Sequence, residues 1–213
     1  MKKFELTSET KINIFGKKLF RIKALISFGN VEAGETGGWV EKEENVNQSG
    51  DAWVFGNAEV FGNARVFDNA RVFGNARVFG NARVFDNARV SGNAWVSGNA
   101  WVSGNAWVFG NARVFGNAEV FGNAEVFDNA WVSGNAWVSG NADYATIHGF
   151  GTQFRTTTFF RCKDKQVKVS CGCFYGTIPE FREQVKNTRK GKIAEEYLMI
   201  ADLMEKHFAE EAK

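Results

Sequence analysis

A six-residue unit repeats without interruption through the middle of the chain, and it constrains the fold more than any other feature. Its alanine recurs sixteen times between Ala52 and Ala142. Valine follows two residues later from Val54 to Val138, and Tyr144 takes its place in the last unit. Alanine, a variable residue and valine alternate as side chains on a strand do, so alanine and valine share the inner face and the variable residue points outward. The Gly-Asn or Asp-Asn pair that ends each unit favours a turn.

A strand of this length cannot bury its apolar face alone, so the units must stack in successive coils, as they do in an all-β solenoid. Three units per coil give a triangular solenoid with about 18 residues per turn, and the period alone also allows a two-unit coil of about 12 residues. With three units, residues 52–141 form five coils. At about 4.8 Å per coil, the regular part is about 24 Å long.

The spacing Ala-x-Val-x-Gly-Asn resembles the hexapeptide repeat of left-handed parallel β-helix proteins. Val54 and its equivalents take the large aliphatic position, and Ala52 and its equivalents take the small one. The resemblance implies left-handed winding, whereas crossover connections are otherwise right-handed. Residues 21–25, 37–41 and 169–174 look like the flanks of uncharacterised hexapeptide proteins from bacterial and prophage genomes. We therefore expect a protein derived from a phage or mobile element.

The segments beside the repeat are expected to cover solenoid ends that would otherwise expose strand edges and apolar core. We assign residues 1–51 to an N-terminal β cap, with a hairpin turn at residues 15–18 and an irregular first coil at Trp39 and Val40. The solenoid itself is assigned to residues 52–146.

Residues 147–213 are expected to form a C-terminal α+β cap. It should contain a hairpin around residues 163–165 and a helix at residues 178–188 that opens with the capping pair Thr177 and Glu180. A second helix should follow Gly191. Its apolar stripe, which should pack on the hairpin, comprises Ile193, Tyr197, Ile200, Met204 and Phe208.

Charge and cysteine content exclude several classes of protein. A formal net charge of +2 excludes an acidic DNA mimic and makes a nucleic-acid partner a poor fit. The three cysteines, Cys162, Cys171 and Cys173, are an odd set that fits a reducing cytoplasm. We expect Cys171 and Cys173 to be core residues of one strand and not metal ligands. No apolar run is long enough to span a membrane and no signal peptide is evident, so we expect a cytoplasmic protein of a bacterial host without a membrane partner.

Repeats of this kind also occur in many acyltransferases, where the resemblance would imply a catalytic histidine on the solenoid and an acyl-CoA or nucleotide-linked substrate. Residues 52–142 contain no histidine, cysteine or lysine, and the two histidines are His148 and His207. A general base must reach the proton that it removes. We therefore assign no catalytic residue, no metal and no cofactor.

Stacking every third unit places the variable residues in three columns. These are Trp53, Arg71, Arg89, Trp107, Glu125; Glu59, Arg77, Trp95, Arg113, Trp131; and Arg65, Arg83, Trp101, Glu119, Trp137. Neighbours in a column should lie about 5 Å apart, close enough for arginine to stack on tryptophan or pair with glutamate. We predict partner or ligand binding by outward residues and by the basic cap. These residues are Arg77, Trp95, Arg113, Trp131, Trp101 and Trp137 on the solenoid, and Arg155, Arg161, Lys163 and Lys165 on the cap.

The residue after each valine is phenylalanine ten times and serine five times. After four of the five serines, the next variable residue across the Gly-Asn corner is tryptophan, so thirteen of the fifteen corners carry one aromatic residue. We interpret this as a corner site that holds one ring, supplied from one side or the other. Rows of such rings would favour a homo-oligomer, either a trimer or a dimer.

Together these features favour a non-enzymatic β-solenoid scaffold or interaction protein that binds a protein partner or an anionic small ligand. One alternative is a phage counter-defence protein that sequesters a nucleotide or another small anion through arginine and tryptophan. The other alternative is a hexapeptide acyltransferase.

Overall fold

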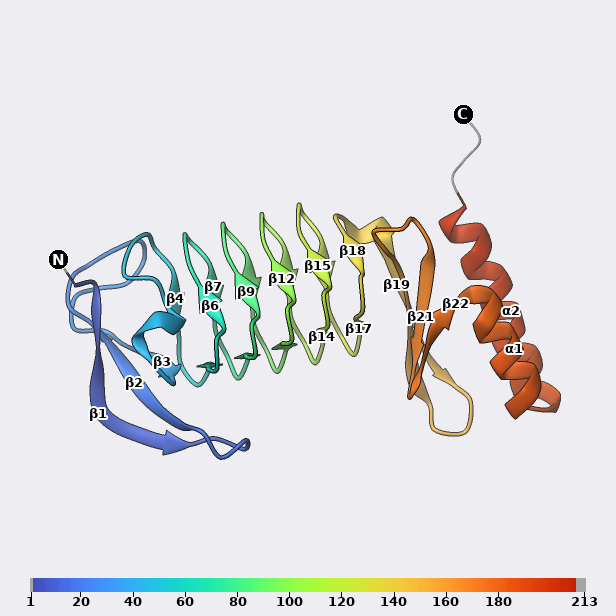
Figure 1. The fold of residues 1–213 in the computed structure, drawn as a ribbon, viewed down its shortest axis with the longest axis horizontal. Helices are drawn as coiled ribbons and strands as arrows, with labels where there is room; N and C mark the ends of the chain where they lie inside the picture. Colours follow the sequence, from blue (N-terminus) through green and yellow to red (C-terminus); the bar gives the residue numbers. More distant parts are fainter. Residues whose placement is uncertain (1, 210–213) are drawn as a thin grey trace.

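A computed structural model describes residues 2–209 and confirms the predicted β-solenoid. An N-terminal hairpin, the coils of the solenoid, a small sheet and two helices follow one another along the long axis of the molecule (Figure 1). The solenoid has three sides, each a parallel sheet, and we call them walls 1, 2 and 3.

Each wall is built from one two-residue strand per coil. Wall 1 comprises β4 (Trp53–Val54), β7 (Arg71–Val72), β10 (Arg89–Val90), β13 (Trp107–Val108) and β16 (Glu125–Val126). Wall 2 comprises β5 (Glu59–Val60), β8 (Arg77–Val78), β11 (Trp95–Val96), β14 (Arg113–Val114) and β17 (Trp131–Val132). Wall 3 comprises β6 (Arg65–Val66), β9 (Arg83–Val84), β12 (Trp101–Val102), β15 (Glu119–Val120) and β18 (Trp137–Val138).

The register of the walls fixes the length of a coil. Trp53 lies opposite Arg71, which lies opposite Arg89, so paired residues are three repeat units apart. Three units therefore make one coil, and the two-unit alternative is wrong. The left-handed winding stays a prediction from the resemblance.

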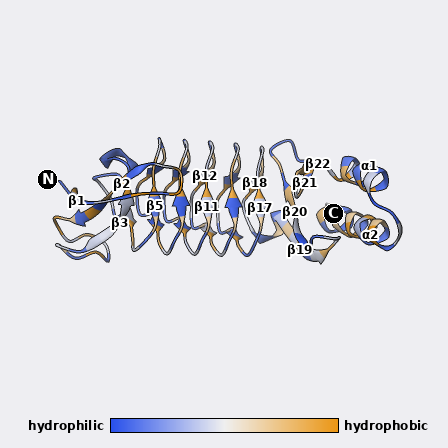
Figure 2. Ribbon diagram, turned by 90° about the horizontal axis from the view of Figure 1, so that it is seen from below, coloured by the Kyte–Doolittle hydropathy of each residue, from blue (hydrophilic) through white to orange (hydrophobic). Residues whose placement is uncertain are grey.

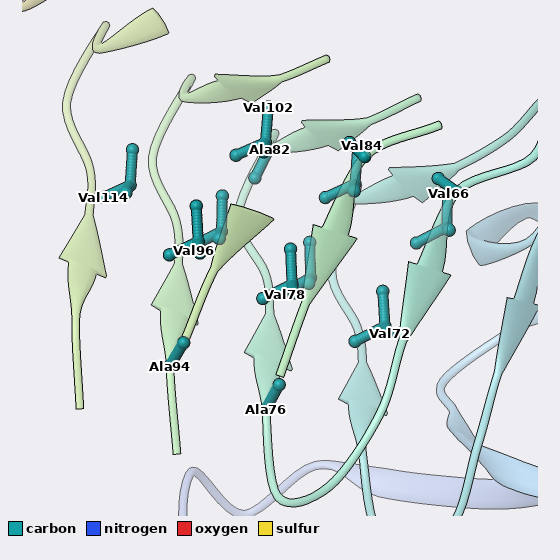
Figure 3. Close-up of a cluster of buried hydrophobic side chains, with 14 of the residues drawn as sticks. Val66, Val72, Ala76, Val78, Ala82, Val84, Ala94, Val96, Val102 and Val114 are labelled. Carbon is teal, nitrogen blue, oxygen red and sulfur yellow. The ribbon is translucent and has the colours of Figure 1, made fainter. Parts of the chain in front are cut away.

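Alanine and valine fill the interior of the solenoid, as the alternation predicts. Every repeat alanine from Ala52 to Ala136 and every repeat valine from Val54 to Val138 is fully buried. Figure 3 shows these side chains stacked between the walls, and Figure 2 shows hydrophobic and hydrophilic residues alternating along each coil. Each buried valine contributes about 1.5 kcal/mol or more, so this column is the main source of stability.

Left-handed backbone closes the corners between walls. Glycine occupies most of these positions, and aspartate adopts the same conformation at Asp68, Asp86 and Asp128, with φ of 57°, 56° and 57°. The next residue is always asparagine, whose side chains form hydrogen-bonded rows along the axis. For example, Asn63 Nδ2 donates to Asn81 Oδ1 at 3.1 Å.

The N-terminal cap begins with the antiparallel hairpin of β1 (Phe4–Ile12) and β2 (Lys18–Ala24). Its predicted turn is confirmed, because Asn13 N donates to Lys17 O at 2.9 Å. β3 (Thr36–Val40) pairs antiparallel with β2 and parallel with β5, so the hairpin extends wall 2 into an eight-stranded sheet. Trp39 pairs with Glu59, and these two residues are farther apart in the sequence than the regular pair Glu59 and Arg77. This longer spacing confirms an irregular first coil. The short helix η1 (Glu43–Asn45) follows β3.

After the short helix η2 (Asn141–Asp143), four antiparallel strands form the sheet of the C-terminal cap. In order across the sheet they are β19 (Tyr144–Phe150), β20 (Arg155–Arg161), β21 (Val167–Cys171) and β22 (Phe174–Thr177). Both predicted helices are confirmed as α1 (Ile178–Thr188) and α2 (Gly191–Phe208), and Thr177 and Glu180 form the capping box. None of the helices in the described residues is long and apolar enough to cross a membrane.

The cap sheet lies between the last coil and the two helices (Figure 1). Phe160 and Cys162 pack into the solenoid core from one face of the sheet, and Phe159 and Val169 pack against the helices from the other. The predicted stripe of α2 faces this second cluster.

The two ends of the solenoid present opposite backbone groups. Each strand donates its N–H groups to the following coil, as Trp53 N does to Ala70 O at 3.1 Å. In wall 2, β3 pairs the carbonyls of the first coil, but in walls 1 and 3 the carbonyls just before the first strands have no such strand beside them. Donor side chains cover them. Lys3 Nζ donates to Gly50 O at 3.1 Å and to Ala52 O at 2.9 Å, and Asn45 Nδ2 donates to Gly62 O at 3.2 Å and to Ala64 O at 2.9 Å.

The last coil leaves N–H groups unpaired, and acceptor side chains of the C-terminal cap bind them. Trp131 N donates to Thr158 Oγ1 at 3.0 Å, and Ser139 N donates to Asp143 Oδ2 at 2.8 Å. Glu125 N donates to Asn141 Oδ1 at 2.8 Å. Each cap therefore satisfies backbone groups that its end of the solenoid exposes.

Candidate functional site

The strand register brings the outward residues together in the three predicted columns. Arginine stacks on tryptophan in walls 2 and 3, as expected from their spacing. The two walls nevertheless differ in how far these side chains are covered by contacts with their neighbours.

In wall 2 the outward residues form a continuous row of contacts. The carboxylate of Glu59 accepts from Arg77 Nε at 3.2 Å, and Glu59 is only 5% exposed. The Arg77 guanidinium lies 5.5 Å from the centre of the Trp95 ring. Arg113 lies between Trp95 and Trp131, at 4.7 and 5.0 Å from their ring centres. The four predicted binding residues of this wall therefore pack against one another.

The N-terminal hairpin covers the first coils of wall 2. Lys11 Nζ lies 2.8 Å from Glu59 Oε1, so Lys11 and Arg77, both partly exposed, form an ion cluster around the buried Glu59 carboxylate. At the hairpin tip, the Phe15 ring contacts the rings of Phe79 and Trp95 with centres 5.2 and 5.8 Å apart. Sequence reasoning missed this cover, because no local pattern connects residue 15 with residue 95.

In wall 3 the aromatic residues remain accessible. Trp101 and Trp137 are 39% and 40% exposed, the largest exposures of any tryptophan in the structure. Arg83 lies 5.2 Å from the Trp101 ring centre and is itself exposed. Lys163 of the cap lies 5.1 Å from the Trp137 ring centre and pairs with Glu119.

A groove of about 500 Å³ lies where wall 3 meets the C-terminal cap. Trp137, Arg161, Lys163 and Lys165 line it, so residues predicted separately on the solenoid and on the cap come together here. Arg161 is held by internal contacts, since its Nη2 donates to Phe208 O at 3.0 Å and its Nε lies 3.5 Å from Asp143 Oδ1. Lys165 is exposed. We define the wall 3 strip as Arg83, Trp101, Trp137, Lys163 and Lys165.

The remaining predicted residue, Arg155, lies at the end of wall 2. It lines a separate groove together with Trp131 and His148. His148 is exposed on β19 rather than on the solenoid, and its Nδ1 lies 3.3 Å from Thr156 Oγ1.

Two outward residues of the first coil are buried, which corrects the prediction that they belong to an accessible column. Trp53 is fully buried, because the rings of Phe4 and Phe28 pack edge-on against it with centres 5.8 and 5.4 Å away. Glu59 is buried by the hairpin. The first coil is therefore part of the N-terminal cap's core.

The interpretation of the ring sites was wrong about which residues share them. Four tryptophans pack edge-on against a phenylalanine of the preceding coil; the pairs are Trp95 with Phe79, Trp101 with Phe85, Trp131 with Phe115, and Trp137 with Phe121. In each pair, the unit that contains the tryptophan has serine two residues after it. The phenylalanine occupies the position of that serine in the preceding coil. In these four units sharing therefore occurs within one unit and not across the corner, whereas another unit holds two rings, Trp107 and Phe109, with centres 4.5 Å apart. The alternation explains this result, because residues two apart on a strand point to the same side.

The prediction that Cys173 belongs to the core was also wrong. β21 ends at Cys171, and the chain turns at Gly172, where φ is 61°. Cys173 is consequently exposed and Cys171 is half-buried. Cys162 is buried at the junction of cap and solenoid, and this burial raises the pKa of its thiol to about 11.

Three stretches of the chain match the YdcK beta solenoid repeat family, at residues 64–80, 70–84 and 82–98. The first and third begin at equivalent positions of successive coils, since Arg65 and Arg83 are paired in wall 3. The matches lie within residues 64–98 and so concern the repeat alone. No curated protein sequence matches the chain significantly.

Proposed function

We propose that the protein is a non-catalytic scaffold that binds an acidic segment of a partner protein along the wall 3 strip. The observation that carries this proposal is the contrast between walls. Wall 2 holds Arg113 between Trp95 and Trp131 and leaves only Trp131, at its C-terminal end, exposed, whereas wall 3 leaves both Trp101 and Trp137 exposed beside Arg83 and Lys163.

The chemistry of the strip fits an extended acidic peptide. Exposed tryptophans anchor many protein interfaces, and cations beside them select carboxylates. Arg83, Trp101 and Trp137 span three coil steps, or about 14 Å, which an extended peptide of about five residues covers. Lys165 at the C-terminal end would pair with a carboxylate of that peptide.

The cationic character of the strip rests on Arg83 and Lys165, which form no ion pair among the described residues, whereas its third cation is neutralised. Glu119 is paired with Lys163, and Asp143 with Arg161. Glu43 and Glu44 line a groove of about 480 Å³ at the N-terminal end of wall 3, together with Arg65 and the strip residue Arg83. We therefore place the centre of the interaction at Trp137 and Lys165.

Affinity capture from a bacterial lysate, with the wild type and matched variants as bait, tests this function. Trp101→Ser/Trp137→Ser and Lys165→Glu should each abolish recovery of a partner that the wild type retains, and recovery should fall as salt rises. Arg71→Gln/Arg89→Gln on wall 1 is the control for general basic attraction and should recover the partner fully. Circular dichroism checks that each bait is folded. Equal recovery by the wild type and both strip variants would contradict the proposal.

A dimer or trimer and an origin in a phage or mobile element remain predictions from the sequence. Light scattering tests the first, with a monomer as the contradicting result. Identification of the captured protein tests the predicted origin, because a scaffold carried by a mobile element is expected to bind a partner that the host encodes.

A further inference from the structure

The groove at the end of wall 2 has features of a small-ligand site that is separate from the wall 3 strip. Its volume is about 690 Å³, which falls within the range of small-molecule sites. The last coil contributes Trp131, and the cap contributes His148, Phe154 and Arg155. It shares no lining residue with the groove of wall 3.

Two aromatic side chains of this groove are available to a planar ligand. Trp131 is 36% exposed, although Arg113 packs against its ring. Phe154 is 64% exposed and has φ of 48°, in the left-handed region that is strained for a bulky residue. The fold gains little packing from a ring held in this way, so the exposed Phe154 ring is explained better by a ligand than by stability.

The charges of the groove select an anion. Within the described part of the chain, Arg155 lines it and no aspartate or glutamate does. The Thr156 hydroxyl lies beside Nδ1 of His148, which leaves Nε2 as the nitrogen for a ligand. A guanidinium and an imidazole together suit a phosphate group.

We propose that this groove binds a small molecule that carries a planar ring and a phosphate, such as a nucleoside monophosphate. The ring stacks against Phe154 and Trp131, and Arg155 binds the phosphate. Neutral hydrogen-bonding side chains complete the lining and match the polar edges of a base and a ribose; they are Asn129, Gln153, Thr156 and Ser170.

Isothermal titration calorimetry with AMP, GMP, CMP and UMP tests the site, and adenosine, ribose 5-phosphate and inorganic phosphate separate the two halves of the ligand. At least one nucleotide should bind with a dissociation constant below about 1 mM. Adenosine and ribose 5-phosphate should each bind about tenfold more weakly or worse. The proposal is overturned if no nucleotide binds at that concentration, or if inorganic phosphate binds as tightly as the nucleotides.

Two variants locate the binding in this groove. Arg155→Gln should weaken nucleotide binding by about 10- to 100-fold and leave adenosine unchanged. Phe154→Gly relieves the left-handed strain and so should fold, yet it should weaken both nucleotide and adenosine. Lys165→Gln, which lies in the groove of wall 3, is the control and should bind as the wild type does. Unchanged binding by Arg155→Gln, or an equal loss in the control, would show that the site lies elsewhere.

Discussion

Walls 2 and 3 are built from the same repeat on the same core, but their outer surfaces differ. In wall 2, Glu59 is buried between Lys11 and Arg77, and Arg113 lies between two tryptophans. In wall 3, Glu119 pairs with one partly exposed lysine and Trp137 is 40% exposed. The difference comes from the order of the outward residues and from the hairpin that covers wall 2. One repeat can thus produce a stabilising surface and an accessible one.

The largest effect is expected from breaking the ion cluster around the buried Glu59 of wall 2. Glu59→Gln removes the charge that pairs with Lys11 and Arg77, and it should lower the free energy of unfolding by about 3 kcal/mol. Glu119→Gln, the matched change in wall 3, should cost at most about 1 kcal/mol, because Glu119 is less buried than Glu59 and has a single partner that is 46% exposed. Urea denaturation followed by tryptophan fluorescence measures both. Equal losses would show that the two walls do not differ in this respect.

Removing one tryptophan from each wall should give a smaller contrast. Trp95→Ser removes a ring that packs against Arg77, Arg113 and Phe79, so we expect a loss of about 2 kcal/mol. Trp137→Ser should cost about 1 kcal/mol or less, because much of its ring faces solvent. Thermal denaturation of the two variants provides the comparison, and a larger loss for Trp137→Ser would contradict it.

Moving a ring within one unit tests how wall 3 fills its ring sites. Trp101→Arg should cost about 1 kcal/mol, because Phe85 loses the ring that packs against it. Adding Ser103→Phe creates the unit Ala-Arg-Val-Phe, which occurs elsewhere in the chain, and should restore stability to within about 0.5 kcal/mol of the wild type. If the second substitution fails to restore stability, the ring site is not shared within the unit.

Lys3, which covers the N-terminal end of wall 1, should make the free energy of unfolding depend weakly on pH. Burial lowers the pKa of Lys3 from 10.5 to about 8 despite the nearby charge of Asp51. Between pH 8 and 10.5 the unfolded chain keeps a proton that the folded protein has lost, so the free energy of unfolding should rise with pH in this window. The penalty for burying the charge is present in full below pH 8. Urea denaturation should show the wild type gaining stability relative to Lys3→Gln from pH 8 to 10.5, and a relative loss would contradict this assignment.

The solenoid and its core could be predicted because they follow from local alternation. Once residues two apart share a face, stacking of identical units leaves little freedom, and the registers of all three columns follow. The helices of the C-terminal cap were likewise signalled by the capping pair at Thr177 and by the spacing of apolar residues in α2.

Contacts between distant segments could not be predicted. The burial of Trp53 and the cover of wall 2 by Phe15 depend on where the N-terminal segment lies, which the repeat does not specify. Cys173 was misplaced because Gly172 ends the strand earlier than the apolar pattern suggested. The sharing of ring sites was predictable, since the alternation already placed residues two apart on one outer face.

Fluorine NMR can show whether an acidic partner reaches the exposed tryptophans of wall 3. The seven tryptophans can be replaced with 5-fluorotryptophan, assigned by single Trp→Phe variants, and titrated with a hexaglutamate peptide. The signals of Trp101 and Trp137 should shift as the peptide is added, while those of Trp53 and Trp95 should stay unchanged. Shifts at Trp95 without shifts at Trp101 and Trp137 would contradict it.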